Sequence, residues 1–528
     1  MPAMSQRTGV LIATILGSAI VFLDATIVNV ALETIGASLP ATFVGRLEGL
    51  TYVNSAYFAV LSALLILAGA LNDYFGRRRM FRIGLIGFGA ASVACGLAPT
   101  METLIAARIV QGAFGAVLVP GSLSIITASF DGQERGRAIG LWAAGTSATS
   151  ILGPLIGGFL VQAVSWRAAY LINVPLVLIA LWATRSVPES RDTDARRNFD
   201  WLGAAVIAIA VGGLAFGATR GQERAWQDPL AWVALGVGAV AAVAIPVLML
   251  TRRNPLVPPS LFESRNFTVV NLSTFVIYGA LYVSFAFTAV FFQGTLGYSP
   301  LGAGAAGIPV AILLSTLSTP AGSWAAKIGP RPFMIVGPLL MAAGLLWFAR
   351  ISPGSPPWQL DAGVPATWLP PGGAIIDVVL GQVVFGTGIA LLVAPLTTAL
   401  MGSIPVRNAG LGSAINNAIS RVGSPLVSAG LFIVISASFY PTLARLAPGV
   451  DVDDPAIREQ VQPLTRPAAD TDPALASAAR EASTDAFRLA MIASAVLLGA
   501  GAAINAVGIR NPADEAPSSA TQAGPAPG

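Results

Sequence analysis

The sequence predicts an all-α polytopic membrane protein, and three observations support this fold class. The chain of 528 residues is 55% hydrophobic and only 11% charged, with a mean hydropathy of +0.73. A soluble protein of this length needs more polar residues to cover its surface. Roughly fourteen apolar runs are long enough to cross about 30 Å of hydrocarbon as helices. The chain also repeats itself, because the glycine and arginine pattern of Gly69–Arg79 recurs from Gly322, 253 residues later.

The expected membrane spans cover most of the chain. Their approximate limits are 10–32, 49–71, 81–98, 103–127, 136–163, 168–187, 201–219, 229–250, 267–293, 303–325, 332–350, 373–400, 408–437 and 486–508. Since their number is even, both termini are expected on the same side of the membrane.

The internal repeat predicts two bundles of six helices. The offset aligns Gly76 with Gly329 and the second span with the tenth, so two spans are left over between the halves. Duplicated bundles of this kind are typical of carriers that rock around a central site. The predicted units are an N-terminal six-helix bundle (1–187), a linker region with two extra transmembrane helices (188–265), a C-terminal six-helix bundle (266–510) with a long outer loop at about 441–485, and a disordered cytoplasmic tail (511–528).

The placement of basic residues predicts the orientation. With both termini inside, the inner loops hold 18 basic residues and the short outer loops hold five. Positive residues accumulate in cytoplasmic loops, so cytoplasmic termini are predicted. The bias toward Arg, Ala and Gly is typical of GC-rich bacteria, which suggests a multi-pass protein of the bacterial inner (plasma) membrane.

The composition excludes several classes of function. Histidine is absent and Cys95 is the single cysteine, so Cys/His metal sites and Ser-His or Cys-His nucleophiles are not expected. The basic residues lie in loops and are not interleaved with exposed aromatic residues, so nucleic-acid binding is not expected. We therefore expect no metal and no enzymatic activity.

Asp24 lies inside the first span, where an ionised carboxylate is costly. Arg108 enters the fourth span from the same side and reaches a similar depth, so the two side chains are expected to interact. One hypothesis is that Asp24 exchanges a proton for substrate while Arg108 lowers its proton affinity in one conformation. The alternative is a static buried ion pair that holds the bundle together.

Four motifs carry a resemblance to a known family. They are Leu23–Leu32 in the first span, Gly69–Arg79 after the second, Arg108–Gly115 in the fourth and Gly145–Gly158 in the fifth. On these motifs the chain resembles the major facilitator superfamily along nearly its whole length, and within it the 14-helix drug:proton antiporter branch of EmrB/QacA type. The resemblance implies the major facilitator fold, proton-coupling roles for Asp24 and Arg108, and transport driven by a proton gradient without a cofactor.

The resemblance also assigns roles to two glycine-containing motifs. It implies a gate on the cytoplasmic side, formed by Gly69, Asp73, Gly76, Arg77, Arg78 and Arg79. It implies a helix-packing antiporter motif formed by Gly145, Gly153, Pro154, Gly157 and Gly158. The alternatives are a loop that only sets topology, and ordinary close packing of helices.

Polar and aromatic stripes on several spans are candidates for a substrate cavity. They are Asn29, Gln111, Tyr278, Tyr282, Phe285, Asn417 and Arg421. Lipid-facing rings and hydrogen bonds between helices explain most of them equally well. Arg421 is different, because a guanidinium in mid-span requires an acceptor, and the nearest acid in sequence, Asp377, is expected closer to the outer surface.

Together these features predict a proton-coupled multidrug or metabolite efflux transporter that works by alternating access. Because the spans hold almost no acid besides Asp24, amphipathic neutral or monocationic substrates are expected. The predicted partners are this small-molecule substrate, protons and the lipid bilayer, and the protein is expected to be a monomer. The alternatives are a membrane-embedded lipid-modifying enzyme and a non-transporting, facilitator-like sensor.

Overall fold

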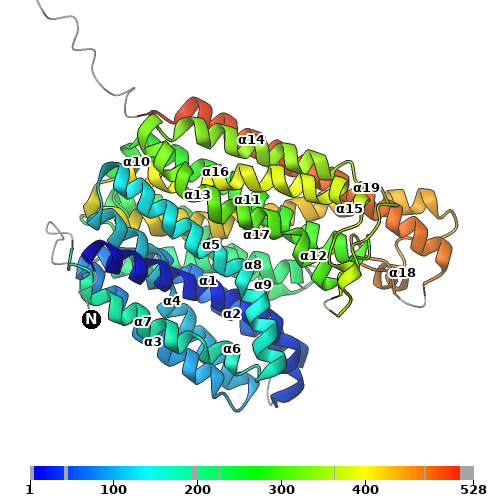
Figure 1. Ribbon diagram of the computed structural model, residues 1–528, viewed down its shortest axis with the longest axis horizontal. Helices are drawn as coiled ribbons and strands as arrows, with labels where there is room; N and C mark the ends of the chain where they lie inside the picture. The colour runs from blue at the N-terminus through cyan, green and yellow to red at the C-terminus, as the bar shows by residue number, and fades with distance from the viewer. Residues whose placement is uncertain are drawn as a thin grey trace, which may run out of the picture.

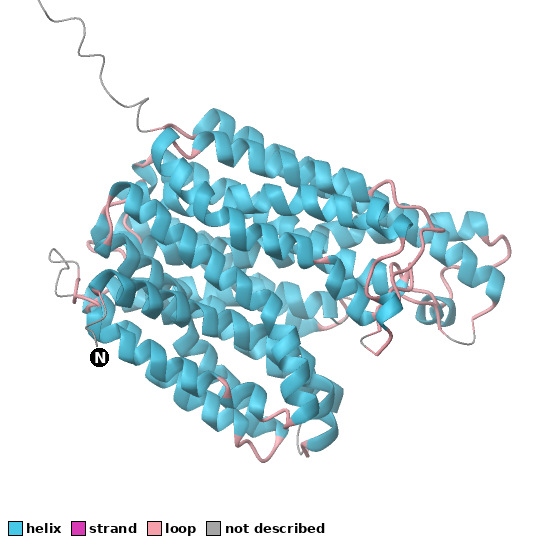
Figure 2. Ribbon diagram, viewed as in Figure 1, coloured by secondary structure: helices cyan, strands magenta, loops and turns pink. Residues whose placement is uncertain are grey.

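The described part of the protein is a bundle of long helices. A computed structural model describes residues 5–40, 46–191, 199–223, 226–361, 363–468 and 471–511. These residues form helices and connecting loops without any strand (Figure 2). The long helices run beside one another along the longest axis of the molecule, and α1 begins at the end marked N (Figure 1). The predicted all-α fold class is therefore confirmed.

The first part of the chain forms α1 to α9. The bounds are α1 Gln6–Ser38, α2 Arg46–Phe75, α3 Arg77–Gly96, α4 Met101–Ser129, α5 Gly132–Ala163, α6 Ala168–Leu171, α7 Asn173–Ala183, the 3-10 helix η1 Thr184–Ser186, α8 Trp201–Glu223 and α9 Pro229–Thr251. Within this part, α1 packs against α5, α2 and α3 pack against α4, and α8 packs against α9.

The second part of the chain forms α10 to α19. The bounds are α10 Ser260–Glu263, α11 Arg265–Gly294, α12 Pro300–Ala306, α13 Ile308–Ile328, α14 Arg331–Phe348, η2 Pro365–Thr367, α15 Gly372–Ala374, the π-helical turn η3 Ile375–Val379, α16 Leu380–Gly402, η4 Val406–Asn408, α17 Ala409–Leu446, α18 Pro455–Gln460 and α19 Pro473–Gly508. Here α14 packs against α16 and α19, and α11 packs against α17.

Local sequence explains where several helices begin. The side chains of Thr100 and Thr103 each accept a hydrogen bond from the other residue's backbone N–H, which forms a capping box at the start of α4. Asp228 and Asp472 cap α9 and α19, and each is followed by a proline in the first helical position. A capping acid followed by proline satisfies free N–H groups and fixes the first turn.

Some helices extend further than hydropathy alone predicts. The expected outer loop at about 441–485 is shorter in the structure, because α17 continues to Leu446 and α19 already begins at Pro473. The remaining connection contains α18. Hydropathy marks where the apolar sequence ends, whereas alanine-rich segments continue as helix into the polar region. The predicted tail lies outside the described residues from 512 onward.

Among the described residues, twelve helical segments are long and apolar enough to cross a membrane. This confirms a polytopic membrane protein. The helices α3 and α5 are not among the twelve, and both begin with a charged turn, which contains Arg77–Arg79 in α3 and Glu134–Arg137 in α5. Both nevertheless pack inside the bundle, α3 against α4 and α5 against α1 and α13.

The two parts of the chain meet through two related pairs of helices. A Cβ added to Gly410 of α17 would lie 2.6 Å from the carbonyl oxygen of Gly69 in α2. A Cβ added to Gly322 of α13 would lie 2.6 Å from the carbonyl oxygen of Gly136 in α5. Gly69 and Gly322 are the aligned glycines of the internal repeat. Both contacts therefore bring backbones together where only glycine leaves room.

Glycine also closes the turn in each copy of the repeat. Gly76 has φ +104° between α2 and α3, and Gly329 has φ +91° between α13 and α14. Residues with a Cβ rarely adopt these angles, so the repeated glycines permit the abrupt change of direction between neighbouring helices.

The helices α8 and α9 lie at the side of the bundle. α8 packs against α2 and α17, whereas only 11% of the apolar window of α9 is buried. In a bilayer, the exposed valine-rich face of α9 would contact lipid. α8 therefore covers the seam between the two parts of the chain and is itself covered by α9.

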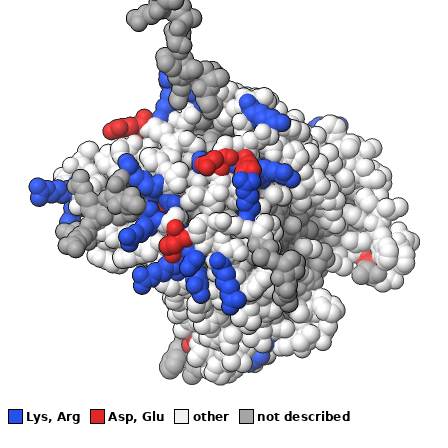
Figure 3. All heavy atoms as spheres, turned by 60° about the vertical axis from the view of Figure 1, so that its left-hand side comes forward, with Lys and Arg blue, Asp and Glu red and all other residues white. Residues whose placement is uncertain are grey.

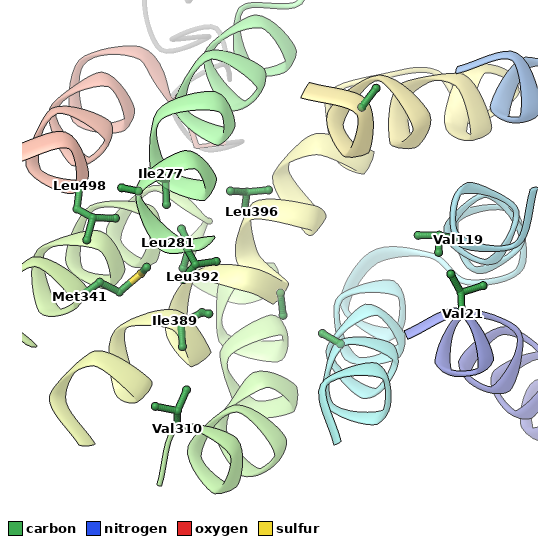
Figure 4. Packing of buried hydrophobic residues seen from close by; sticks show 14 of the residues in the cluster. Val21, Val119, Ile277, Leu281, Val310, Met341, Ile389, Leu392, Leu396 and Leu498 are labelled. Atoms are coloured by element: carbon green, nitrogen blue, oxygen red, sulfur yellow. The ribbon is translucent and has the colours of Figure 1, made fainter. Parts of the chain in front are cut away.

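Buried apolar residues from both parts of the chain belong to one connected core. Leu281 of α11, Met341 of α14 and Leu392 of α16 lie close together, and Val21 of α1 faces Val119 of α4 some way from them (Figure 4).

Candidate functional site

The centre of the first part of the chain holds a fully buried ion pair. Nη1 of Arg108 lies 2.5 Å from Oδ2 of Asp24, and both side chains have an exposed fraction of 0%. The carboxylate comes from the middle of α1 and the guanidinium from α4. The prediction that these two side chains meet is therefore correct in this structure.

The remaining acceptor of Asp24 is also satisfied. Its Oδ1 accepts hydrogen bonds from Nε2 of Gln111 at 3.0 Å and from Nδ2 of Asn173 at 2.9 Å. Oγ of Ser92 accepts from the same two amides, at 3.2 and 2.9 Å. Gln111 follows Arg108 by three residues on α4, so both side chains lie on one face of that helix. The carboxylate on α1 is therefore bonded by side chains from α4 and α7, and Ser92 of α3 accepts from the two amides.

The guanidinium of Arg108 makes further contacts with α2. Its Nε donates to the carbonyl oxygen of Val53 at 3.0 Å, and its Nη2 donates to Oδ1 of Asn54 at 3.4 Å. The ring of Tyr57 lies 4.0 Å from the guanidinium carbon, which adds a cation–π contact. Arg108 thus connects the carboxylate on α1 to the backbone and side chains of α2.

A cavity lies between the two parts of the chain beside this cluster. One portion of about 560 Å³ is bordered by α1, α2, α8, α11 and α17, and a second of about 420 Å³ is bordered by α1, α4, α5, α11, α13, α16 and α17. Phe22, Tyr282 and Arg421 line both portions. The combined space is in the range of small-molecule binding sites.

The structure brings most of the predicted cavity residues together. Tyr278, Tyr282, Phe285, Asn417 and Arg421 all line the second portion. Gln111 is different, because it is fully buried in the ion-pair cluster and does not line the cavity. The side chain of Asn29 lies outside the described part of the structure.

Several residues of the site were not identified from the sequence. Asn54 both contacts Arg108 and lines the first portion of the cavity. Ser92 and Asn173 complete the shell around Asp24. The available signal was a polar side chain inside an apolar span, but many such residues only bond their own helix.

A second buried acid lies at the opposite end of α2. Oδ1 of Asp73 accepts from Nε and Nη2 of Arg77, at 3.0 and 2.9 Å, and from Oγ of Ser124 at 3.1 Å. Its Oδ2 accepts from the backbone N–H of Leu411 in the first turn of α17 at 2.9 Å. Arg77 also donates to the carbonyl oxygen of Val406. Asp73 and Arg77 therefore hold both parts of the chain together at this end.

The other arginines of the hairpin make contacts within the first part of the chain. The backbone N–H groups of Arg78 and Arg79 each donate to the Glu189 carboxylate at 3.1 Å, which caps the start of α3. The guanidinium of Arg78 donates to the carbonyl oxygen of Val187. In the second copy of the repeat, Arg331 donates to the carbonyl oxygen of Ala506. Among the described residues, the charged contact across the two parts, made by Asp73 and Arg77, is therefore specific to the first copy.

Basic side chains gather on the face of the molecule that carries this hairpin (Figure 3). This face forms the end where α1 begins in Figure 1. We refer to it as the arginine-rich end.

The glycines of the predicted packing motif lie on α5 against α1. A Cβ added to Gly145 would approach Ile15, one on Gly153 would approach Thr26, and one on Gly157 would lie 3.2 Å from the Cα of Ile27. A Cβ on Gly158 would have no heavy atom within 4 Å among the described residues. The side chain of Pro154 lies outside the described part. Three of the four glycines thus permit close approach of α5 to α1.

A membrane bundle with a cavity between two parts and a buried ion pair beside it is the architecture of a secondary transporter. The comparisons with known proteins agree. Residues 14–428 match the family model described as "Major Facilitator Superfamily". The chain belongs to this superfamily, whose members are transporters and not enzymes.

Two relatives are drug-resistance proteins. "Multidrug resistance protein Stp" of Mycobacterium tuberculosis is 32% identical over 443 residues, which cover 83% of this chain and 78% of Stp. "Puromycin resistance protein pur8" of Streptomyces alboniger is 32% identical over 448 residues, 83% of each chain. The solved structure of the human organic anion transporter MFSD10 (TETRAN) is similar with a TM-score of 0.59 at 16% identity and covers 96% of this chain and all of that one, which shows the fold alone.

Two neighbouring glycines test the packing motif. We expect Gly157→Ala to lower the thermal melting temperature in detergent, because the new Cβ presses on the backbone of Ile27 and overpacking costs about 1–3 kcal/mol. Gly158→Ala should leave the melting temperature unchanged or raise it, because alanine favours helix. An equal fall in melting temperature in both variants would contradict the close contact of Gly157 with Ile27.

The contact of Asp73 with α17 can be tested by distance measurement. We expect Asp73→Asn to add longer distances between spin labels at positions 82 and 402 in a Cys95→Ala background. Breaking a buried ion pair costs about 3–5 kcal/mol, so the closed arginine-rich end loses population. Arg78→Gln is the matched control, because its side chain contacts the first part of the chain. An unchanged distance distribution in Asp73→Asn would refute the role of this contact.

Proposed function

We propose that the protein is a proton-coupled efflux transporter that exports amphipathic compounds by alternating access. The observation that carries this proposal is the buried cluster around Asp24, which lies directly behind the wall of a cavity between the two parts of the chain. The names of the relatives, which refer to resistance to several drugs and to puromycin, support export as the direction of transport.

In this proposal, a residue of α2 couples substrate binding to the protonation of Asp24. Asp24 is not a lining residue of either portion of the cavity, so substrate does not replace the proton on it directly. Asn54 lines the cavity and accepts from Arg108, which holds Asp24. Substrate that displaces Asn54 alters the position of Arg108 and hence the proton affinity of the carboxylate.

The arginine-rich end is the cytoplasmic end in this proposal, because basic residues remain inside. The contacts of Asp73 with α17 and of Gly136 with Gly322 close that end in this structure. The cavity reaches Tyr52 near the start of α2, at the opposite end of that helix. The conformation is therefore outward-facing, with both termini in the cytoplasm of a bacterial cell.

We further propose the 14-helix organisation of the antiporter branch. It requires that α3 and α5 also cross the bilayer, which their lengths of 20 and 32 residues permit. The boundaries at about residues 188 and 265 then leave α8 and α9 as the extra pair. Phe216, Thr219 and Arg220 of α8 line the cavity, so the extra pair contributes to the site.

One proton suffices to drive useful export. A proton that moves inward through about 100 mV supplies roughly 2.3 kcal/mol, which supports a concentration ratio of around fiftyfold for an uncharged substrate. The competing hypothesis, a static ion pair, predicts no link between substrate and proton movement.

Asp24→Asn separates these hypotheses. In proteoliposomes we expect this variant to bind and exchange substrate but to lose substrate-dependent proton flux, because an amide does not titrate. Asp377→Asn is the matched control, since Asp377 lies on another span and contacts Ser355. Proton flux is read from an internal pH dye, with N-phenyl-1-naphthylamine as the transported probe.

Retained proton flux in Asp24→Asn would refute the coupling role.

An experiment in cells tests whether the protein is an efflux transporter at all. Cells that lack their own pumps and express this protein should exclude N-phenyl-1-naphthylamine, and a protonophore should abolish the exclusion. If the protein has no effect on dye uptake, the efflux function is wrong.

A further inference from the structure

Arg421 occupies a central position in the cavity. It lies on α17, is partly buried and lines both portions of the space between the two parts of the chain. Its guanidinium makes no hydrogen bond or ion pair with any described residue. A guanidinium is always charged and offers five N–H donors, so at membrane depth it requires water or a ligand as acceptor.

The charged side chains in the described lining of the cavity are arginines. The described lining of both portions contains no Asp and no Glu. The other lining cation, Arg220, is paired with Asp228 at 2.7 Å and also donates to the hydroxyl of Tyr52 at 2.6 Å. Asp24 is held by Arg108 behind the wall. Among the described lining residues, one positive charge without an ionic partner therefore faces the cavity, and in a medium of low polarity it attracts an anion strongly.

The surroundings of Arg421 fit the body of an amphipathic molecule. Tyr278 and Tyr282 lie with ring centroids 5.9 Å apart, and Phe285 follows on the same helix. Phe22 and Trp142 face them from the first part of the chain. Asn417, one turn before Arg421, adds an amide next to the guanidinium. Aromatic walls with a few polar groups at one place are typical of sites that orient a largely apolar ligand.

We propose that Arg421 binds the anionic group of an amphipathic monoanion, such as a carboxylate, sulfonate or phosphate monoester, whose apolar body lies between the aromatic residues. This inference rests on the proposed function only in treating the cavity as the transport site. Neutral or monocationic substrates were expected from the sequence, and a monocation would meet a like charge here. The planar fork of arginine matches an oxyanion with two parallel hydrogen bonds.

Two probes that differ in one anionic group test the proposal. 8-Anilinonaphthalene-1-sulfonate is an amphipathic monoanion, and N-phenyl-1-naphthylamine is the same ring system without the sulfonate. Binding is measured by equilibrium dialysis with the full chain in phosphatidylcholine nanodiscs, and empty nanodiscs are subtracted. We expect the wild-type protein to bind the sulfonate more tightly than the neutral probe.

The variants separate charge recognition from structure. Arg421→Gln should weaken sulfonate binding about ten- to hundredfold, because charge-assisted hydrogen bonds are lost, and should change binding of the neutral probe less than about threefold. Arg421→Lys keeps the charge and should bind the sulfonate more tightly than Arg421→Gln. Arg220→Gln removes a cation that is already paired with Asp228, so it should reduce the affinity for the sulfonate less than Arg421→Gln does.

Three outcomes would overturn the proposal. The first is that Arg421→Gln loses affinity for both probes equally. The second is that Arg421→Gln keeps its affinity for the sulfonate. The third is that Arg421→Lys and Arg421→Gln lose the same affinity for the sulfonate. If Arg421→Gln does not fold, the comparison of the two probes on the wild-type protein tests the proposal alone. Tighter binding of the neutral probe than of the sulfonate would then refute the anion site. Transport is not needed for these measurements, so a protein that binds the sulfonate but fails the efflux assay refutes the proposed function alone.

The same anion chemistry occurs in soluble compounds and in lipid headgroups. Nanodiscs that contain phosphatidylglycerol distinguish the two sources. If lipid occupies the site, sulfonate binding to the wild-type protein weakens in these nanodiscs while Arg421→Gln is unaffected, and Arg421 then binds an anionic headgroup. If binding is equal in both lipids, the bound monoanion is a soluble amphiphile.

Discussion

The ion pair between Asp24 and Arg108 constrains the first part of the molecule. Two charges removed from water cost several kcal/mol each unless their hydrogen bonds are satisfied. Here both carboxylate oxygens and three guanidinium nitrogens have partners, which come from α1, α2, α4 and α7. Ser92 of α3 joins the cluster through the amides that hold the carboxylate. A change in the protonation of Asp24 alters the balance of all these contacts together. The cluster therefore ties the charge on one carboxylate to the positions of five helices.

The helix α2 links this cluster to the closed end of the protein. Val53 and Asn54, near its start, accept hydrogen bonds from Arg108. Gly69 and Asp73, near its end, contact the first turns of α17. In the proposed mechanism, a shift at Arg108 moves the start of α2, and the continuous helix carries this movement to the contact with α17. Arg108, the partner of Asp24, therefore contacts one end of α2, Asp73 lies near the other end, and the cavity lies beside this helix.

The sequence was sufficient for features that depend on single residues in an unusual setting. An acid and an arginine at similar depth in two spans predicted the ion pair. The glycine contacts of α2 with α17 and of α5 with α13 were not predicted, although the repeat marks Gly69 and Gly322. The sequence was not sufficient for Gln111, which a polar stripe assigned to the cavity, or for Asn54 and Asn173. Their roles depend on which face of a helix points inward, and short helical periodicity in an apolar span does not determine this. The ends of several helices also differed from the predicted limits of the spans, because hydropathy describes contact with lipid and not backbone conformation.

The charge of the cargo determines which force drives export. Exchange of one inward proton for one outward monocation moves no net charge, so only the pH gradient acts on it. Exchange for a monoanion moves two charges in the direction favoured by an inside-negative membrane. At about 100 mV this is worth roughly 4.6 kcal/mol, or a concentration ratio of more than about a thousandfold. Arg421, which makes no hydrogen bond or ion pair with a described residue, thus suits a pump that uses the membrane potential. The described lining of the cavity holds no acid, and the proposed proton carrier, Asp24, lies behind the wall.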